Sequence, residues 1–134
     1  MVVDASVWVS ALVGRDTHHG VSRRWLQQRL EATEPLIAPT LLLPEVAGAV
    51  ARRTGAAEDG LEAAAEIQTM SAVRLVSLDA AICGEAARLA ATLKLRGADA
   101  VYVAVARALN LAVVTWDQEI ILRAGGIIEV IQPV

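Results

Sequence analysis

The chain has 134 residues, a length that fits a single domain over 1–134 and buries roughly two thirds of the unfolded chain's surface without disulfide or metal support. Its net charge of −3, from 15 acidic and 12 basic residues, gives no general attraction to nucleic acid, so any RNA or DNA contact must come from local bases or bound cations. Hydrophobic residues make up 55% and aromatic residues 3%, which indicates a core of Ala, Val, Leu and Ile, and no charge-free stretch is long enough to predict a membrane span.

The hydrophobic surplus also predicts a covered surface. Large exposed apolar patches are uncommon on monomers, so we expect a homodimer or a protein partner. The single cysteine, Cys83, cannot form an internal disulfide, which favours a reducing compartment. The apolar N-terminus has no basic leader and carries Asp4, so it does not resemble a signal peptide, and we expect a cytoplasmic protein.

Short runs of Val, Ile and Leu alternate with longer Ala- and Leu-rich segments, an order typical of a parallel sheet with helices on its faces. The predicted fold class is therefore α/β, a three-layer α/β/α sandwich around about five short strands that are buried on both sides. In chain order we expect a strand at 1–4, helices at 6–13 and 17–32, a strand at 35–38, helices at 41–53 and 57–71, a strand at 73–77, helices at 80–95 and 99–109, a strand at 111–115, a helix at 117–124 and a strand at 128–131.

Four acidic residues each stand as the only charge in an apolar stretch: Asp4, Glu45, Asp99 and Asp117. An ion moved into the interior costs several kcal/mol, and the four stretches contain no Lys or Arg to pair with it. Asp4 and Asp117 follow predicted strands, so both lie at the carboxyl edge of the sheet, where open α/β folds bind ligands. Glu45 and Asp99 lie near helix starts and can lean over the same edge. These oxygen donors suit Mg²⁺ or Mn²⁺.

Two hydroxyls flank this predicted cluster. Ser6 lies two residues after Asp4, and Thr115 lies two residues before Asp117, so both can hydrogen-bond the metal ligands or their waters. A simpler interpretation of the aspartates remains open, because Asp is a favoured helix N-cap and Asp99 and Asp117 each precede a helical pattern. Asp79 is also the only charge in an apolar stretch, and we interpret it as a cap for helix 80–95.

Four segments, each with one of the isolated acids, form a recognisable set of motifs: MVVDASVWVSALV, PTLLLPEVAGAVARR, LRGADAVYVAVARALN and LAVVTWDQEIIL. With these motifs the chain resembles a PIN domain of the small kind found in VapC-type toxins of toxin–antitoxin pairs. The resemblance implies a metal-dependent endoribonuclease in which Asp4, Asp99 and Asp117 bind Mg²⁺ or Mn²⁺ and Glu45 completes the catalytic acidic cluster. It also implies an RNA substrate, a cognate antitoxin protein as partner, and activity that EDTA abolishes.

Other polar residues have two interpretations each. Trp116, a large residue inside the Thr-x-Asp motif, either stacks on an unpaired base or packs on the sheet, and we favour packing. His18 and His19 lie in a polar segment, GRDTHHG, and we expect solvent exposure rather than catalysis. Bases that could contact RNA phosphates, or form a solvated surface, are Arg15, Arg52, Arg53, Lys94 and Arg96.

Other functions compete with the toxin interpretation. A response-regulator receiver requires adjacent acids near its first strand, and a haloacid-dehalogenase-type phosphatase requires Asp-x-Asp there, whereas Asp4 is followed by Ala5 and Ser6. A PIN fold kept as a non-catalytic interaction module remains open, with an antitoxin helix docked in an apolar groove. A housekeeping RNA-processing nuclease also remains open.

Overall fold

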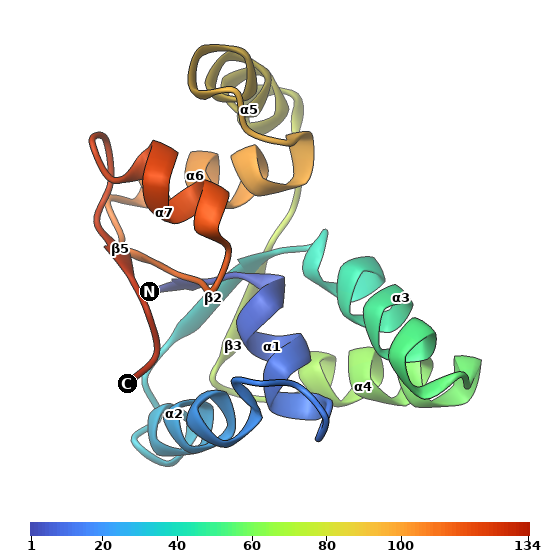
Figure 1. Cartoon of the computed structure of the whole chain (residues 1–134). Helices are drawn as coiled ribbons and strands as arrows, with labels where there is room; N and C mark the ends of the chain where they lie inside the picture. Colours follow the sequence, from blue (N-terminus) through green and yellow to red (C-terminus); the bar gives the residue numbers. More distant parts are fainter.

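The computed structural model describes all residues 1–134 and has a central five-stranded parallel sheet with helices on both faces (Figure 1). The predicted α/β class is confirmed, and each predicted strand and helix is present, with each end at the predicted residue or within two residues of it. None of the helices is both long and apolar enough to span a membrane.

The elements in chain order are β1 (Val2–Val3), α1 (Ala5–Leu12), α2 (His19–Glu31), β2 (Leu36–Pro39), α3 (Leu42–Thr54), α4 (Ala57–Thr69), β3 (Val73–Val76), α5 (Ala80–Leu93), α6 (Gly97–Leu109), β4 (Val113–Val114), α7 (Gln118–Ala124) and β5 (Val130–Ile131).

The sheet order is β3-β2-β1-β4-β5, with β1 in the centre. The chain moves outward from β1 to β3 on one side and then returns to pair β4 with the other side of β1. This reversal between β1 and β4 creates a crevice at the carboxyl edge of the sheet, the place where open α/β sheets bind ligands. The topology therefore brings the residues that follow β1 and β4 together.

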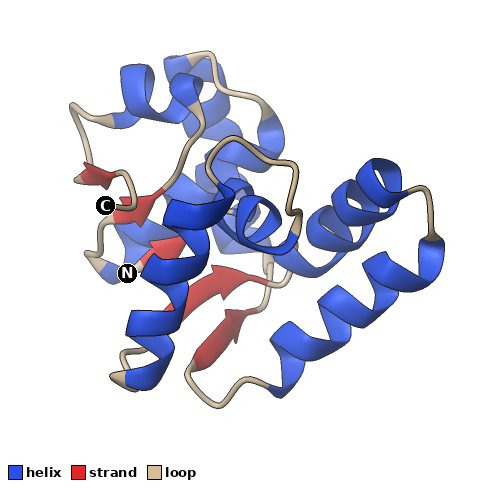
Figure 2. Ribbon diagram, turned by 60° about the horizontal axis from the view of Figure 1, so that its bottom comes forward, coloured by secondary structure: helices blue, strands red, loops and turns tan.

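The helices form two layers and a side arm. Helices α5, α6 and α7 lie on one face of the sheet, and α1 and α2 lie on the other (Figure 1). Helices α3 and α4 pack against each other as a hairpin that extends to the side of the sheet (Figure 2). The N-terminal part of α3 still lies near α1, so this hairpin contributes residues to the carboxyl edge.

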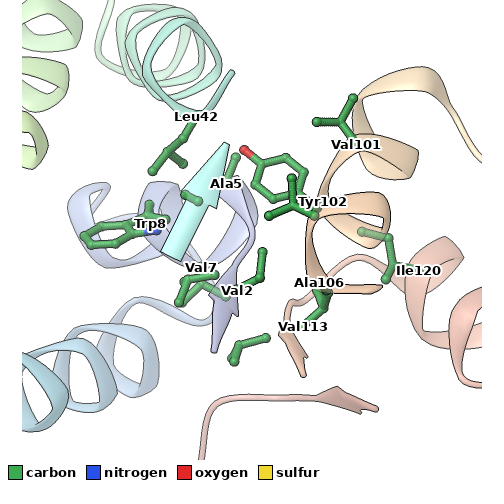
Figure 3. Packing of buried hydrophobic residues seen from close by; sticks show 14 of the residues in the cluster. Val2, Ala5, Val7, Trp8, Leu42, Val101, Tyr102, Ala106, Val113 and Ile120 are labelled. Carbon is green, nitrogen blue, oxygen red and sulfur yellow. The ribbon is translucent and has the colours of Figure 1, made fainter. Parts of the chain in front are cut away.

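Helix α6 occupies the centre of the hydrophobic core. All eight residues from Asp99 to Ala106 are buried, and most of them are Ala or Val. Small side chains allow this helix to pack closely against α5, α7 and three strands. Figure 3 shows the ring of Tyr102 beside Ala5, with its hydroxyl pointing away from Ala106 and Val113. The Tyr102 hydroxyl thus points out of the apolar core while its ring stays inside it.

The hairpin of α3 and α4 depends on one close backbone approach. A methyl group built on Gly60 of α4 would lie 2.1 Å from the backbone oxygen of Ala47 in α3, a distance that no real contact reaches. Gly55, which ends α3, has a φ of 81°, the left-handed conformation that glycine adopts without strain. Both glycines are therefore required by the geometry of this hairpin.

We expect Gly60→Ala to lower the free energy of unfolding by ~1–3 kcal/mol, because the added methyl must push α4 away from α3. The matched control is Gly84→Ala in α5, where an added methyl meets no atom within 4 Å. That control should stabilise the chain by ~0.5–1 kcal/mol through helix propensity. Urea denaturation measures both values, and equal effects of the two substitutions would contradict the close approach.

Candidate functional site

Parallel pairing places Asp4 beside Thr115. Val3 in β1 lies opposite Val114 in β4, so the residues that follow them leave the sheet side by side. The Oγ1 of Thr115 donates to Oδ2 of Asp4 at 2.8 Å, and Oγ of Ser6 donates to the same oxygen at 2.5 Å. The backbone N–H of Ser6 also donates to Oδ2, at 3.3 Å. This oxygen of the buried Asp4 is saturated, whereas Oδ1 accepts no hydrogen bond.

The segment after β4 is tied to the same two hydroxyls. The backbone N–H of Trp116 donates to Oγ of Ser6 at 3.0 Å, and that of Asp117 donates to Oγ1 of Thr115 at 2.9 Å. Asp117 then caps α7 by accepting the N–H groups of Glu119 and Ile120 on its Oδ1, at 2.8 and 3.2 Å. Asp117 is therefore an N-cap and a member of the cluster at once.

Glu45 and Asp99 lie in the first turns of α3 and α6. Negative charge is stabilised there by the positive ends of the helix dipoles. Helix α6 begins at Gly97, so Asp99 is inside the helix and the N-cap interpretation does not hold for it. Asp79, in contrast, caps α5 by accepting the N–H of Ile82 at 2.8 Å, as its sequence position predicts.

Tyr102 is a site residue that sequence reasoning did not identify. Its hydroxyl donates to Oε2 of Glu45 at 2.5 Å, and its side chain is otherwise fully buried. It is the only tyrosine in the chain. A buried phenol needs a hydrogen-bond partner, so the single tyrosine in the apolar stretch of Asp99 could have indicated a polar contact near the acidic cluster. Oε1 of Glu45 accepts no hydrogen bond.

Arg96 pairs with two of the four acids, although none of the four apolar stretches contains a base. Its Nε donates to Asp99 at 2.9 Å and its guanidinium Nη2 donates to Asp117 at 2.7 Å. Arg96 precedes the apolar stretch of Asp99 by a single residue, so counting charges within that stretch excluded it. Among the bases expected to contact RNA phosphates, Arg96 is instead bound to carboxylates.

The four acids, Ser6 and Arg96 line one pocket of about 240 Å³. Burial raises the pKa of Asp4 above its ordinary value, although the hydroxyls of Ser6 and Thr115 oppose this shift. Burial is the largest cause that raises the pKa of Glu45, and the negative charges of Asp4 and Asp99 raise it further. The hydrogen bond from Tyr102 lowers it in part. Burial also raises the pKa of Asp99, with Asp117 adding to it and Arg96 opposing it. The pocket therefore holds more negative charge than its surroundings stabilise.

The donor set fits a hard divalent cation in its chemistry. Asp4, Glu45 and Asp99 all line this pocket, and each has one carboxylate oxygen that accepts no hydrogen bond. In the present arrangement, however, no three acids converge closely enough to hold a metal ion. Arg96 lines the same pocket and pairs with Asp99 and Asp117, so a cation would compete with its guanidinium for these carboxylates.

A larger groove of about 710 Å³ adjoins the acidic pocket and shares Ala5, Ser6, Glu45 and Asp117 with it. Arg52 and Arg53 from the end of α3 line this groove, and Arg53 forms an ion pair with Asp16. Arg15 lies in a separate pocket, and Lys94 is an exposed residue at the end of α5. The structure thus brings Arg52, Arg53 and Arg96 to the acidic edge and leaves Arg15 and Lys94 away from it.

Trp116 packs against the hydrophobic core, as the favoured interpretation predicted, and it also contacts a histidine. Its ring is half-buried and stacks on the exposed ring of His18, with 3.9 Å between ring centroids and 8° between planes. Its Nε1 donates to Oγ of the buried Ser22 at 2.8 Å. The exposure expected of His18 is present, but its stacking on Trp116 was not expected. His19 is half-buried and lines a different groove, formed mainly by α1, α2 and α4.

The PIN domain model matches residues 1–126. The chain is similar to the solved structure of VapC20 from Mycobacterium tuberculosis, a sarcin–ricin loop cleaving toxin, at 25% identity and a TM-score of 0.76, with 96% of each chain covered. It shares its fold with a toxin–antitoxin complex from Klebsiella pneumoniae, at 20% identity and a TM-score of 0.68 over 99% of this chain and 97% of that one. It also shares its fold with VapBC2 from Rickettsia felis bound to promoter DNA, at 13% identity and a TM-score of 0.70 over 99% of this chain and 98% of that one. None of the curated proteins has a significantly similar sequence.

We expect Arg96→Gln to tighten Mn²⁺ binding roughly three- to ten-fold, because the site loses a competing positive charge close to the ion. Stability of the metal-free protein should fall by at most ~1 kcal/mol, since the Arg96 side chain is 71% exposed and water screens its ion pairs. Titration calorimetry and thermal denaturation measure the two effects. The control is Arg107→Gln, which removes the ion pair with Glu85 away from the site. Equal Mn²⁺ affinity of both variants would contradict the competition.

Proposed function

Because this chain belongs to the PIN domain family, we propose that it is a Mg²⁺- or Mn²⁺-dependent endoribonuclease and the toxin of a toxin–antitoxin pair. Family membership confirms the resemblance carried by its four acidic segments. The proposal treats residues 1–134 as one catalytic domain. Its support from relatives is the similarity to VapC20, which is described as a toxin that cleaves the sarcin–ricin loop.

One observation carries the nuclease proposal: four carboxylates from different parts of the chain line a single pocket of about 240 Å³. Three of them have a raised pKa, so the cluster gains stability from any cation that enters it. A cluster with this much negative charge would repel RNA in the absence of a cation. The same cation that neutralises the carboxylates would therefore also admit a phosphodiester.

In this proposal Asp4, Asp99 and Asp117 hold the metal, and Glu45 completes the acidic cluster. A bound Mg²⁺ or Mn²⁺ supplies Lewis-acid chemistry, lowering the pKa of water and offsetting charge on the phosphoryl oxygens. Ser6 and Thr115 bind one oxygen of Asp4 and leave its other oxygen without a hydrogen bond, available to a metal ion.

Tyr102 does the same for Glu45. These hydrogen bonds orient the carboxylates before any ligand arrives, which is the role of outer-shell partners in metal sites.

We further propose an antitoxin protein as partner. An apolar groove of about 400 Å³ lies between α1, α2 and α4, lined by Trp8, Leu26, Leu30, Ile67 and Met70 among others. A groove of this composition accepts the apolar face of an amphipathic helix. Its acceptance of an antitoxin segment accords with the toxin–antitoxin complexes among the structural relatives.

A second copy of the chain is also part of the proposal. Leu109 at the end of α6, Leu122 in α7 and Ile127 in the following turn are exposed apolar residues from the C-terminal part of the chain. Leu122 exposes 77% of its surface. These residues support the homodimer that the hydrophobic composition predicts.

We expect Asp99→Asn to abolish Mn²⁺ binding and RNA cleavage while the protein stays folded, because the substitution removes a ligand charge and keeps the side-chain volume. Titration calorimetry with Mn²⁺, circular dichroism, and a cleavage assay on total RNA with and without EDTA measure these outcomes.

The matched control is Asp79→Asn. Asn is as good an N-cap as Asp, and Asp79 lies at the start of α5, outside the acidic pocket. Its metal binding and cleavage should equal those of the wild type. Undiminished cleavage by Asp99→Asn, or equal losses in both variants, would refute the assignment of the acidic pocket as the active site.

A further inference from the structure

Two aromatic rings stand at the edge of the acidic pocket. Trp116 immediately precedes Asp117, and both line the groove of about 710 Å³ together with His18. The two rings are parallel within 8°, with 3.9 Å between their centroids, so they form a two-layer stack. The stack belongs to the groove that continues from the acidic cluster, and neither the metal ligands nor their hydrogen-bond partners account for it.

Trp116 is anchored to the protein by hydrogen bonds, and His18 forms the exposed side of the stack. Nε1 of Trp116 donates to the buried Oγ of Ser22, which also accepts a 2.5 Å hydrogen bond from Ser10. The backbone of Trp116 is tied to Ser6 at 3.0 Å. These bonds fix the tryptophan relative to Asp4, because Ser6 donates to that carboxylate. His18 covers Trp116 and is itself exposed, so the outer face of its ring is available to a ligand.

We propose that the His18–Trp116 stack is a binding site for one unpaired base of a single-stranded RNA, next to the phosphate that enters the acidic pocket. The proposal rests on the nuclease function and names the form of its substrate. Flat aromatic rings bind bases by stacking, and every base has a face that can stack. A base in a duplex already has its faces covered by its neighbours, so this site selects single strands.

The charge distribution of the groove favours a nucleotide over an apolar ligand. Arg52 lines the same groove, and its guanidinium lies over Gly48, one turn back along α3 toward Glu45. Arg52 forms no ion pair, whereas its neighbour Arg53 is paired with Asp16. Arg52 is therefore the cation in the groove that is free to contact a phosphate beside the stacked base.

The test measures RNA binding without cleavage, in the wild-type protein with Mn²⁺ and a phosphorothioate-linked RNA that resists hydrolysis. We expect a fluorescein-labelled single-stranded hexaribonucleotide to bind, and its affinity to fall about ten-fold on His18→Leu, which keeps an apolar side chain over Trp116 but removes the ring. The same strand annealed to its complement should bind more weakly. RNA should also quench tryptophan fluorescence at Trp116, because Trp8 and Trp25 are only 2% and 3% exposed.

The matched control is His19→Leu, the same substitution in the neighbouring residue, whose ring lines the apolar groove instead. It should leave RNA affinity unchanged. Equal affinities of the His18→Leu and His19→Leu proteins, or equal binding of single and double strands, would overturn the proposal. RNA binding that depends on His18 in a wild-type protein that cuts no RNA with Mn²⁺ would refute the nuclease function and support the base site.

Discussion

The mutual repulsion of four carboxylates at one edge of the sheet is the constraint on which this structure depends. Parallel β/α topology makes such a gathering hard to avoid, because helices that follow strands begin at the same edge. Asp4 and Asp117 cap two of these helices, and Glu45 and Asp99 lie in the first turns of two others. Each position stabilises one negative charge through the helix dipole, but the four charges also face each other.

Hydrogen bonds from three hydroxyl groups and the positive charge of one arginine side chain partly offset this repulsion. Hydroxyls of Ser6, Thr115 and Tyr102 bind one oxygen on each of two acids, and Arg96 bridges the other two. Raised pKa values at Asp4, Glu45 and Asp99 show that these partners do not offset burial and repulsion completely. The remaining imbalance is what a divalent cation would relieve, so the same electrostatic feature costs stability and provides function.

The sequence predicted the elements and the four acids because both depend on local patterns, apolar periodicity and isolated charge. It did not predict contacts that join distant segments. The Tyr102–Glu45 bond links residues 57 apart in the chain, and the stack of His18 on Trp116 links two loops. The pairing of Arg96 with Asp99 and Asp117 was not predicted, because Arg96 lies just outside the apolar stretch and only the fold brings its side chain to Asp117. Lys94 ends α5 with a φ of 55°, a conformation that the identity of a lysine does not predict.

The central claim is that the acidic pocket is a divalent-cation site in which Arg96 pairs with two of the four carboxylates in the metal-free protein. A crystal structure of the protein soaked in Mn²⁺, with anomalous diffraction data, tests it most directly. We expect an anomalous peak in the pocket between Asp4 and Asp99, with the Arg96 side chain moved away from its two carboxylates. A pocket without an anomalous peak at saturating Mn²⁺, with Arg96 still bridging Asp99 and Asp117, would contradict the account.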